Sequence, residues 1–220
     1  MLEELREANE YIISKIREND ELILEMEKYA EEHNVPIVTK EVAEYLKFIV
    51  RSNNIKNVLE VGTAIGYSGI LMAKEIEKNN GKLYTIEIDE ERYNLAQENF
   101  KKSGLKNIVS IKGDAVEEIK KIDENFDFVF IDASKGHYLE FFEDSYKLLN
   151  KNGIIFIDNI MFRGYLYKEY PKRFKTIVRR LNEFIEYLYS REGGEFVLLP
   201  FGDGIGLFCK QIPENTNEEK

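Results

Sequence analysis

Cysteine and histidine are scarce in this chain of 220 residues, and their scarcity limits the sites that it can build. A single cysteine, Cys209, excludes an internal disulfide framework and any zinc site with several cysteine ligands. The two histidines, His33 and His137, are too few for a histidine-rich zinc site. Cys209 lies in the apolar run 205–209, so we expect it to be a small buried strand residue.

Long apolar runs and an excess of positive charge are missing as well. No stretch approaches the length of a membrane span, and no basic and apolar leader opens the sequence. We therefore expect no membrane partner and a cytoplasmic location. The net charge of −10 argues against a broad nucleic-acid-binding surface but leaves room for a local basic patch.

Apolar runs alternate with amphipathic stretches through most of the chain, which predicts an α/β fold. The last two strands are joined by so short a connection that they must form a hairpin, which makes one of them antiparallel. The fold class is a doubly wound, seven-stranded, mostly parallel sheet with an antiparallel C-terminal strand. Strands are expected at 58–61, 82–87, 108–112, 126–132, 154–158, 196–199 and 205–209, and helices at about 67–79, 90–103, 115–121 and 138–150.

The first 34 residues read as a helical extension in front of this core. Spaced apolar positions predict two helices broken near Asn19-Asp20, and Thr39 is placed to cap a third helix that ends near Ser52. No linker divides the chain, so one domain is expected over 1–211. The polar tail 212–220 is expected to be disordered.

Two of the apolar runs end in acids, in Phe128-Val129-Phe130-Ile131-Asp132 and in Ile154-Ile155-Phe156-Ile157-Asp158-Asn159. The carboxyl ends of parallel strands face one crevice, where open α/β sheets bind their ligands. Two carboxylates and an amide carbonyl, from Asp132, Asp158 and Asn159, form an oxygen set suited to Mg²⁺, with Mn²⁺ and Ca²⁺ as alternatives.

Lys135 follows Asp132 by three residues and is a candidate for the catalytic base or for stabilising an oxyanion. A substrate with two adjacent oxygens would chelate the cation, which lowers the pKa of a hydroxyl and orients it for attack on a methyl group. The alternative for Lys135 is an exposed loop lysine. His137 has the same alternative, that of a loop residue away from the chemistry.

A glycine-rich turn follows the first predicted strand, in Val58-Leu59-Glu60-Val61-Gly62-Thr63-Ala64-Ile65-Gly66-Tyr67-Ser68. Its Gly-x-x-x-Gly spacing differs from the Gly-x-Gly-x-x-Gly of dinucleotide binders, which disfavours an NAD-dependent dehydrogenase. Glu60 would repel a phosphate but suits a cationic amine, while the helix-start amides and Ser68 suit a carboxylate. Amine and carboxylate together are the amino-acid end of S-adenosylmethionine.

An acid also ends the second predicted strand, and another follows the third. Glu87 is placed to accept hydrogen bonds from ribose hydroxyls, and Asp114 from an adenine amino group, with Ala115 leaving room for the ring. The alternative is that each acid is only a surface residue or a helix cap, which is a serious reading for Asp114 alone.

These motifs, with Ile131-Asp132-Ala133-Ser134-Lys135-Gly136-His137-Tyr138, resemble the cation-dependent O-methyltransferases, a family that includes catechol and caffeoyl-CoA methyltransferases. The resemblance covers roughly residues 30–210. It implies metal binding at Asp132, Asp158 and Asn159 and a catalytic role for Lys135. It also implies a homodimer, and cofactor binding at Val38, Gly62, Ser68, Glu87, Asp114, Ala115 and Asp132.

Other segments resemble the bacterial subgroup that methylates the 5-hydroxyl of a tRNA wobble uridine in the anticodon loop: 29–37, 158–164 and Gly202-Asp203-Gly204. Val38 departs from the methionine expected there, but both side chains are apolar. In 5-hydroxyuridine the hydroxyl is adjacent to the C4 carbonyl, so the two oxygens can chelate a cation as a catechol does. Tyr165, Tyr167 and Tyr170 are candidates for stacking on bases.

A basic segment over 163–180 is the candidate phosphate-binding patch, opposed only by Glu169. Its alternative is the solvated face of an amphipathic helix. Two rival functions remain open: a small-molecule catechol or phenol methyltransferase, and a nucleotide- or RNA-binding module without catalysis. The candidate RNA-binding residues are Arg163, Lys172, Arg173, Lys175, Arg179 and Arg180, with Lys168 as a seventh basic residue in the segment.

Overall fold

The computed structural model describes residues 2–17 and 20–211, which form two compact units that meet at Ala115 and Val116. The predicted break at Asn19 and the predicted disorder of 212–220 lie outside the described residues. The single domain predicted over 1–211 stays a prediction. In the described part of the chain, no helix is both long and apolar enough to cross a bilayer.

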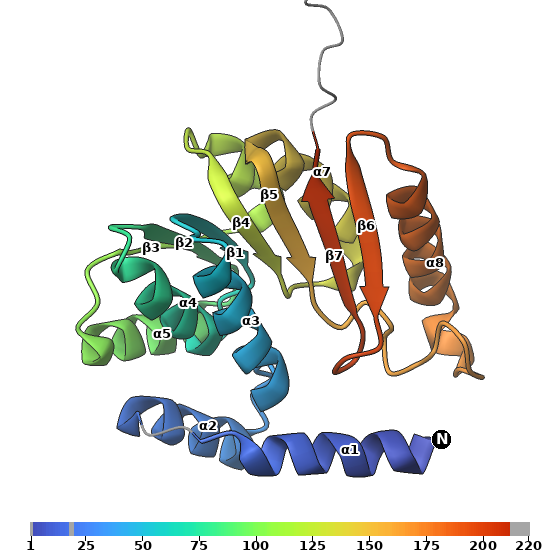
Figure 1. Ribbon diagram of the computed structural model, residues 1–220, viewed down its shortest axis with the longest axis horizontal. Coiled ribbons are helices and arrows are strands. Elements are labelled where there is room, and N and C mark those ends of the chain that lie inside the picture. Colours follow the sequence, from blue (N-terminus) through green and yellow to red (C-terminus); the bar gives the residue numbers. More distant parts are fainter. Residues whose placement is uncertain (1, 18–19, 212–220) are drawn as a thin grey trace, which may run out of the picture. The chain divides into compact units, whose positions relative to one another are not determined.

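The N-terminal unit joins a layer of helices to three parallel strands in the order β3-β2-β1. In Figure 1, the blue helices α1 and α2 lie beyond α3 and α5, on the side away from the strands. Asp20 caps α2 by accepting a hydrogen bond from the Ile23 amide. The elements are α1 (Leu2–Lys15), α2 (Glu21–His33), α3 (Lys40–Ser52), β1 (Asn57–Val61), α4 (Tyr67–Glu77), β2 (Lys82–Glu87), α5 (Glu90–Ser103) and β3 (Ile108–Lys112).

The C-terminal unit has four strands that lie side by side in the order β4-β5-β7-β6 (Figure 1). Strands β4 and β5 are parallel, and β7 is antiparallel to both of its neighbours, as the short final connection predicts. The elements are η1 (Ile119–Lys121), β4 (Phe126–Ile131), η2 (Lys135–His137), α7 (Tyr138–Leu148), β5 (Leu149–Ile157), η3 (Lys172–Phe174), α8 (Lys175–Ser190), β6 (Gly194–Leu199) and β7 (Ile205–Lys210). A short helix, α6 (Ala115–Glu118), begins at the boundary of the units.

Strand β5 begins five residues earlier than its apolar run predicts. Its pairing with β4 is irregular, because Phe126 pairs with Leu149 whereas Phe128 pairs with Ile154. The polar residues between Leu149 and Ile154 hide this bulged first part of the strand from an apolar pattern, and Asn152 within it has a φ of +60°.

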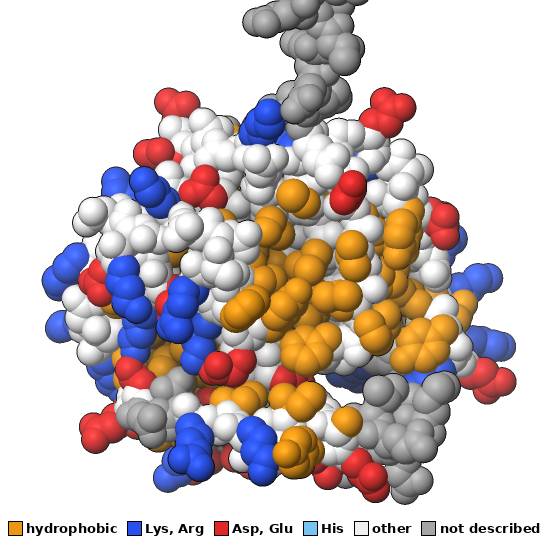
Figure 2. Space-filling view, viewed as in Figure 1, with side chains coloured by type: hydrophobic (Ala, Val, Ile, Leu, Met, Phe, Trp, Pro, Cys, Tyr) orange, Lys and Arg blue, Asp and Glu red, His pale blue; other side chains and the backbone are white. Residues whose placement is uncertain are grey.

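One face of the C-terminal sheet is packed by aromatic rings from α7 and α8. The Phe142 ring centroid lies 5.1 Å from that of Phe208, and Tyr189 lies 4.9 Å from Phe196. The opposite face carries apolar residues from β5, β7 and β6, among them Val197, which is 50% exposed. Figure 2 shows hydrophobic side chains gathered over these strands. Cys209 lies on this face and is only partly buried, which corrects the expectation of a buried thiol.

Gly66 in the glycine turn lies so close to the Phe100 ring that a side chain there would clash with it. Gly66 has a φ of +86°, and a Cβ there would lie 2.6 Å from Cε1 of Phe100 in α5. Gly104 has a similar φ of +73°, but its Cβ would meet nothing within 4 Å. The two glycines therefore separate the cost of a left-handed backbone from the cost of a steric clash.

We expect Gly104→Ala to lower the free energy of unfolding by about 1–2 kcal/mol, the cost of a left-handed alanine. Gly66→Ala should cost about 1–3 kcal/mol more, because the Phe100 ring must also move. Urea unfolding of both variants measures the difference, and equal losses would contradict the proposed close approach of Phe100.

Candidate functional site

The glycine turn places backbone amides and two acids at the carboxyl ends of β1 and β2. The amides of Gly62 and Thr63 donate to the Ile86 carbonyl at 3.1 and 3.2 Å, which fixes the turn against β2. Ala64 and the two turn glycines, Gly62 and Gly66, have positive φ angles. This tight reversal exposes little side-chain bulk, which suits the close approach of a ligand to the backbone.

Glu60 lies beneath this turn and is fully buried. Its carboxylate accepts hydrogen bonds from the Ser68 hydroxyl at 2.5 Å and from the Thr85 hydroxyl at 2.6 Å. Glu60 and Ser68 are thus hydrogen-bonded to each other, whereas the sequence predicts that each contacts the cofactor separately. A buried carboxylate satisfied by two hydroxyls also holds the turn in place.

Glu87, the last residue of β2, joins the glycine turn to the next loop. Its Oε2 accepts from the Ala64 amide at 2.8 Å, and its Oε1 accepts from the Asp89 amide at 2.9 Å. Asp114 follows β3, and the amide of the intervening Gly113 donates to the Glu87 carbonyl at 2.9 Å. Three acids thus follow one another along the carboxyl ends of β1, β2 and β3, as the sequence predicts.

Asp114 is exposed, whereas Ala115 beside it is buried. Val38 is also buried, and it lines a pocket of about 590 Å³ together with Tyr67, the neighbour of Ser68. The Tyr67 hydroxyl donates to Glu27 at 2.8 Å, and Glu27 is paired with Lys40 at 2.6 Å. This bridge from α4 through α2 to the start of α3 is not visible in the sequence pattern, because its residues are far apart in the chain.

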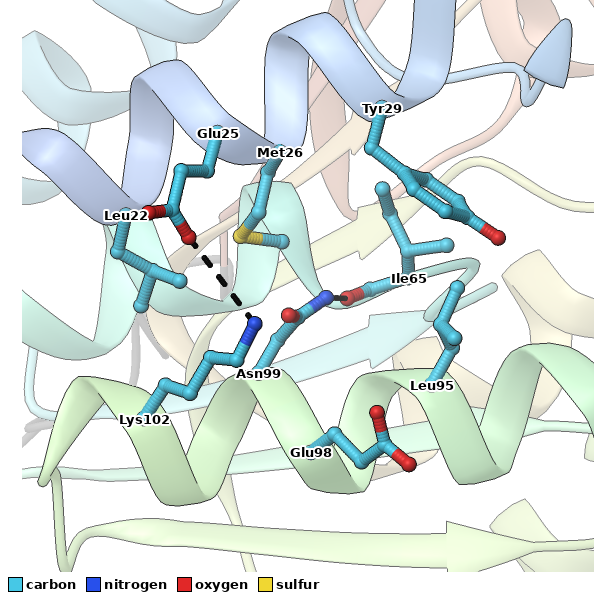
Figure 3. Close-up of a pocket in the computed structure, with 9 residues that line it drawn as sticks. All are labelled: Leu22, Glu25, Met26, Tyr29, Ile65, Leu95, Glu98, Asn99 and Lys102. Carbon is cyan, nitrogen blue, oxygen red and sulfur yellow. Dashed lines mark hydrogen bonds and ion pairs between the residues drawn. The ribbon is translucent and has the colours of Figure 1, made fainter. Parts of the chain in front are cut away.

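A second pocket, of about 210 Å³, lies between α2 and α5 (Figure 3). The Asn99 side chain donates from Nδ2 to the Ile65 carbonyl at 2.9 Å, so α5 also holds the glycine turn. Lys102 and Glu25 face one another across the pocket at 4.0 Å. Hydrogen bonds from two elements, β2 and α5, therefore hold the glycine turn.

The C-terminal unit brings the candidate metal ligands together. Ile131 pairs with Ile157 in the parallel register of β4 and β5, so Asp132 and Asp158 leave the sheet at the same level. The Asp158 amide donates to the Ile131 carbonyl at 3.0 Å. Asn159 follows directly, and its amide donates to Oδ1 of Asp158 at 2.7 Å. The structure thus places all three predicted oxygen donors at one edge of the unit.

Burial and mutual repulsion shift the pKa values of the two acids. Burial, followed by the negative charge of Asp132, raises the pKa of Asp158 to about 7. Burial also raises the pKa of Asp132, and the Lys135 ammonium opposes that shift. A buried and a partly buried carboxylate of like charge are unfavourable together unless a cation compensates them.

This donor set fits a hard divalent cation, because it consists of carboxylate and amide oxygens and lies where negative charge is undercompensated. Among the described side chains, those of residues 7–17 and 20–211, no group of three or more His, Cys, Asp or Glu is placed to hold a metal ion. Two carboxylates with an amide are a set of a different composition. Asp132, Asp158 and Asn159 are the residues that would hold the ion, and their role as ligands stays a prediction.

Lys135 opens η2 and interacts electrostatically with Asp132, Asp158 and Asp203. Its side chain is partly buried beside these charges, and its catalytic role stays a prediction. His137 is exposed and bonds through Nδ1 to Glu140 at 2.5 Å, in agreement with its reading as a loop residue.

Tyr138 is a residue that the sequence pattern does not single out. Its buried hydroxyl donates to the Asp158 carbonyl at 2.8 Å, so α7 fixes the backbone of a candidate ligand. Burial, and then the charges of Asp132 and Asp158, raise the pKa of Tyr138, which keeps its hydroxyl protonated. The only hint in the sequence is its position three residues after Lys135.

The candidate RNA-binding residues begin in the loop after Asn159 and continue into α8. All six are exposed, whereas Val178 and Leu181 on the other side of α8 are buried. Arg179 is ion-paired with Glu183 at 2.7 Å, and Arg180 donates to the Gly136 carbonyl at 3.4 Å. Arg180 therefore also supports the loop that carries Lys135.

The three candidate stacking tyrosines differ in their packing. Tyr165 stacks on Phe174 at 5.4 Å and contacts Phe162 at 5.5 Å, so it packs within its own loop. Tyr167 and Tyr170 are 64% and 40% exposed, which leaves their rings accessible to a ligand.

The raised pKa of Asp158 should make the cation-free protein less stable as the pH rises. Its folded pKa of about 7 exceeds the ordinary value of 3.8, so between these pH values the folded state binds more protons than the unfolded chain. The free energy of unfolding should fall by about 1–3 kcal/mol over this range. Asp158→Asn should flatten the fall, because asparagine stays neutral.

Urea unfolding in the presence of a chelator at several pH values measures this dependence. Asp123→Asn, at an exposed position, is the matched control and should retain the dependence of the unmodified protein. An equal pH dependence in the Asp158→Asn variant would contradict the assigned cause.

Known proteins are similar to this chain in sequence and in fold. Residues 14–212 match the family model described as O-methyltransferase. The chain is 32% identical over 176 residues to Tapetum-specific methyltransferase 1 of Arabidopsis thaliana, covering 76% of this chain and 75% of that protein. It is also 32% identical over 164 residues to Catechol O-methyltransferase of Niastella koreensis, covering 71% and 74%.

A crystal structure of an O-methyltransferase from Bacillus cereus, in complex with SAH, superposes with a TM-score of 0.84 at 24% identity, covering 96% of this chain and 100% of that one. TomG from Streptomyces achromogenes, in complex with SAM, gives 0.83 at 23% identity, covering 94% and 96%. The predicted fold class is confirmed, and so is the resemblance at the level of the family. This chain belongs to the O-methyltransferase family of class I, S-adenosylmethionine-dependent enzymes.

Proposed function

We propose that this O-methyltransferase uses Mg²⁺ and methylates the 5-hydroxyl of 5-hydroxyuridine at the tRNA wobble position, giving 5-methoxyuridine. The observation that carries the choice of tRNA is the exposed basic segment that begins four residues after Asn159. In a chain of net charge −10, this concentration of positive charge fits phosphate groups. Exposed Tyr167 and Tyr170 in the same segment fit unstacked loop bases.

S-adenosylmethionine supplies the methyl group, and the proposed cofactor residues are those named from the sequence. Glu87 and Asp114 would accept hydrogen bonds from the ribose and the adenine, with Ala115 beside the ring. The glycine turn would approach the amino-acid end, with Glu60 acting from beneath it through Ser68. The full proposed set is Val38, Glu60, Gly62, Ser68, Glu87, Asp114, Ala115 and Asp132.

The reaction is an in-line displacement in which the uridine hydroxyl oxygen attacks the sulfonium methyl group. The new bond joins oxygen to carbon, and the carbon–sulfur bond breaks to leave S-adenosylhomocysteine. Asp132, Asp158 and Asn159 would hold the divalent cation, which would supply Lewis-acid stabilisation of the oxyanion. In this proposal Lys135 would hold the negative charge as an ammonium or, in its neutral form, would accept the hydroxyl proton.

A second candidate is a small-molecule catechol or caffeoyl-CoA-like methyltransferase. Its support is the set of relatives, which includes Catechol O-methyltransferase of Niastella koreensis and caffeoyl-CoA O-methyltransferases of plants. Both candidates use the same cation and the same pair of adjacent substrate oxygens, so the site alone does not separate them. The basic segment separates them, because a free catechol has no phosphate.

A homodimer is part of the proposal, since the apolar face of β5, β7 and β6, with half-exposed Val197, offers a surface for a second copy. The mass in solution, measured by sedimentation velocity, decides this point. A cytoplasmic location is likewise proposed, as the compartment in which the substrate tRNA occurs.

The proposed substrate predicts the nucleoside content of tRNA. In cells that lack the gene, 5-methoxyuridine should disappear from bulk tRNA and 5-hydroxyuridine should remain, as measured by nucleoside mass spectrometry. Expression of the unmodified chain should restore 5-methoxyuridine, whereas Asp158→Ala should not. An unchanged nucleoside profile in the deletion strain would refute the tRNA substrate.

The basic segment predicts a selective loss of activity. Replacing Lys172, Arg173 and Lys175 by glutamine should lower kcat/KM for tRNA by roughly tenfold or more at low salt, and should reduce the salt dependence. Turnover of a free catechol should stay the same, as should both activities of a control with exposed Lys78 and Lys82 replaced by glutamine. Equal losses on both substrates would instead indicate a structural role for the segment.

A further inference from the structure

The loop after Asp158 has an unusual backbone. Asn159, Phe162 and Arg163 have φ angles of 51°, 46° and 58°, and Gly164 follows at 74°. Side chains other than glycine rarely adopt this left-handed region, because their Cβ approaches the following carbonyl oxygen. Such a concentration of disfavoured angles persists only where the surrounding contacts impose it.

The contacts that hold this left-handed backbone come from the connection between β6 and β7. The Asp203 carboxylate accepts from the Arg163 amide with both oxygens, at 2.6 and 2.7 Å, and also accepts from the Gly164 amide. The backbone amides of Met161 and Ile160 donate to the carbonyls of Asp203 and Gly204, both at 3.0 Å. Ile160, Met161 and Arg163 therefore donate their amide hydrogen bonds to Asp203 and Gly204 of the hairpin. The Phe162 amide between them donates to the Asn159 carbonyl at 3.1 Å.

Gly204 makes this contact sterically feasible. It has a φ of +83°, and a Cβ there would lie 2.3 Å from Cγ and 2.7 Å from Cβ of Met161. Any larger residue would push the hairpin away from the loop. The loop is also anchored from within by Ile160, which is fully buried. The sequence Asp203-Gly204 thus combines a carboxylate acceptor with the close approach that it needs.

The charge of Asp203 does not make it a further ligand. Its carboxylate is occupied by the two loop amides, whereas the candidate ligands Asp132 and Asp158 leave β4 and β5 directly. Asp203 is close enough to Lys135 and Asp158 to influence both electrostatically, which places the hairpin at the same edge of the unit. Its direct contacts, however, are with the backbone that follows Asn159.

We propose that Asp203 is a positioning residue that, by holding the loop 160–164, fixes Asn159 in the left-handed conformation that presents its amide oxygen to the divalent cation. The inference rests on the proposed cation site. Groups that orient metal ligands without touching the metal are commonly worth 10–100-fold in metal affinity. Asp203 acts in this way on the backbone rather than on a ligand side chain.

The test is Mn²⁺ binding to the full chain, measured by isothermal titration calorimetry alongside urea unfolding of each variant. Asp203→Ala removes both acceptors and should weaken Mn²⁺ binding by roughly tenfold or more. Asp203→Asn keeps one carbonyl oxygen for the Arg163 amide and should weaken it less, by about threefold. Asp158→Ala should abolish binding.

Tyr146→Phe is the matched structural control, since it removes a hydrogen bond to the Gly193 carbonyl just before β6 without touching the loop. It should alter unfolding but leave Mn²⁺ affinity unchanged. If Asp203→Ala does not fold, Asp203→Asn decides the question by the same titration.

The outcomes distinguish a failure of the cation site from a failure of the positioning role of Asp203. If the unmodified chain does not bind Mn²⁺, the proposed cation site is wrong. If it binds Mn²⁺ and both folded Asp203 variants bind with the same affinity, the site stands and the positioning role of Asp203 is overturned. A loss of affinity in Tyr146→Phe equal to that in Asp203→Ala would also overturn it, because the effect would then follow general stability.

Discussion

The register between β4 and β5 is the constraint on which the rest of the candidate site depends. Pairing of Ile131 with Ile157 brings two carboxylates out of the sheet at one level, where burial favours their neutral forms. A shift of the pairing by one residue would turn every side chain of β5 to the other face. The aromatic packing of the C-terminal unit, led by Phe130, Phe142 and Phe156, therefore also protects the spacing of the acids.

Much of this arrangement follows from the sequence, because buried parallel strands produce unbroken apolar runs. Strand β2 and α5 lie at their predicted bounds, and Asp132 and Asp158 follow β4 and β5 as expected. The early start of β5 escapes prediction because its first residues are polar and bulged. The positions of Glu60 and Ser68 are predictable, but their mutual hydrogen bond is not, since it depends on how deeply the glycine turn lies above β1.

The other features that the sequence does not predict are contacts between residues far apart in the chain. Tyr67, Glu27 and Lys40 come from three helices, and no periodic pattern links them. Asn99 reaches the carbonyl of Ile65 from a helix that begins after the next strand. Such contacts arise only once the elements have packed, so propensity and spacing carry no signal for them. Gly202-Asp203-Gly204 is different, because two glycines around an acid mark a turn even where its partner is unknown.

The hairpin contact determines when, during translation, the loop after Asn159 can fold. A nascent chain that ends before Phe201 already contains both acids, Asn159 and Lys135. It contains none of the acceptors from Asp203 and Gly204 that hold the loop after Asn159. Translation must therefore pass Gly204 before this loop can take its final shape. Truncation of the last strand pair would remove the geometry of the loop while leaving the predicted metal ligands in the sequence.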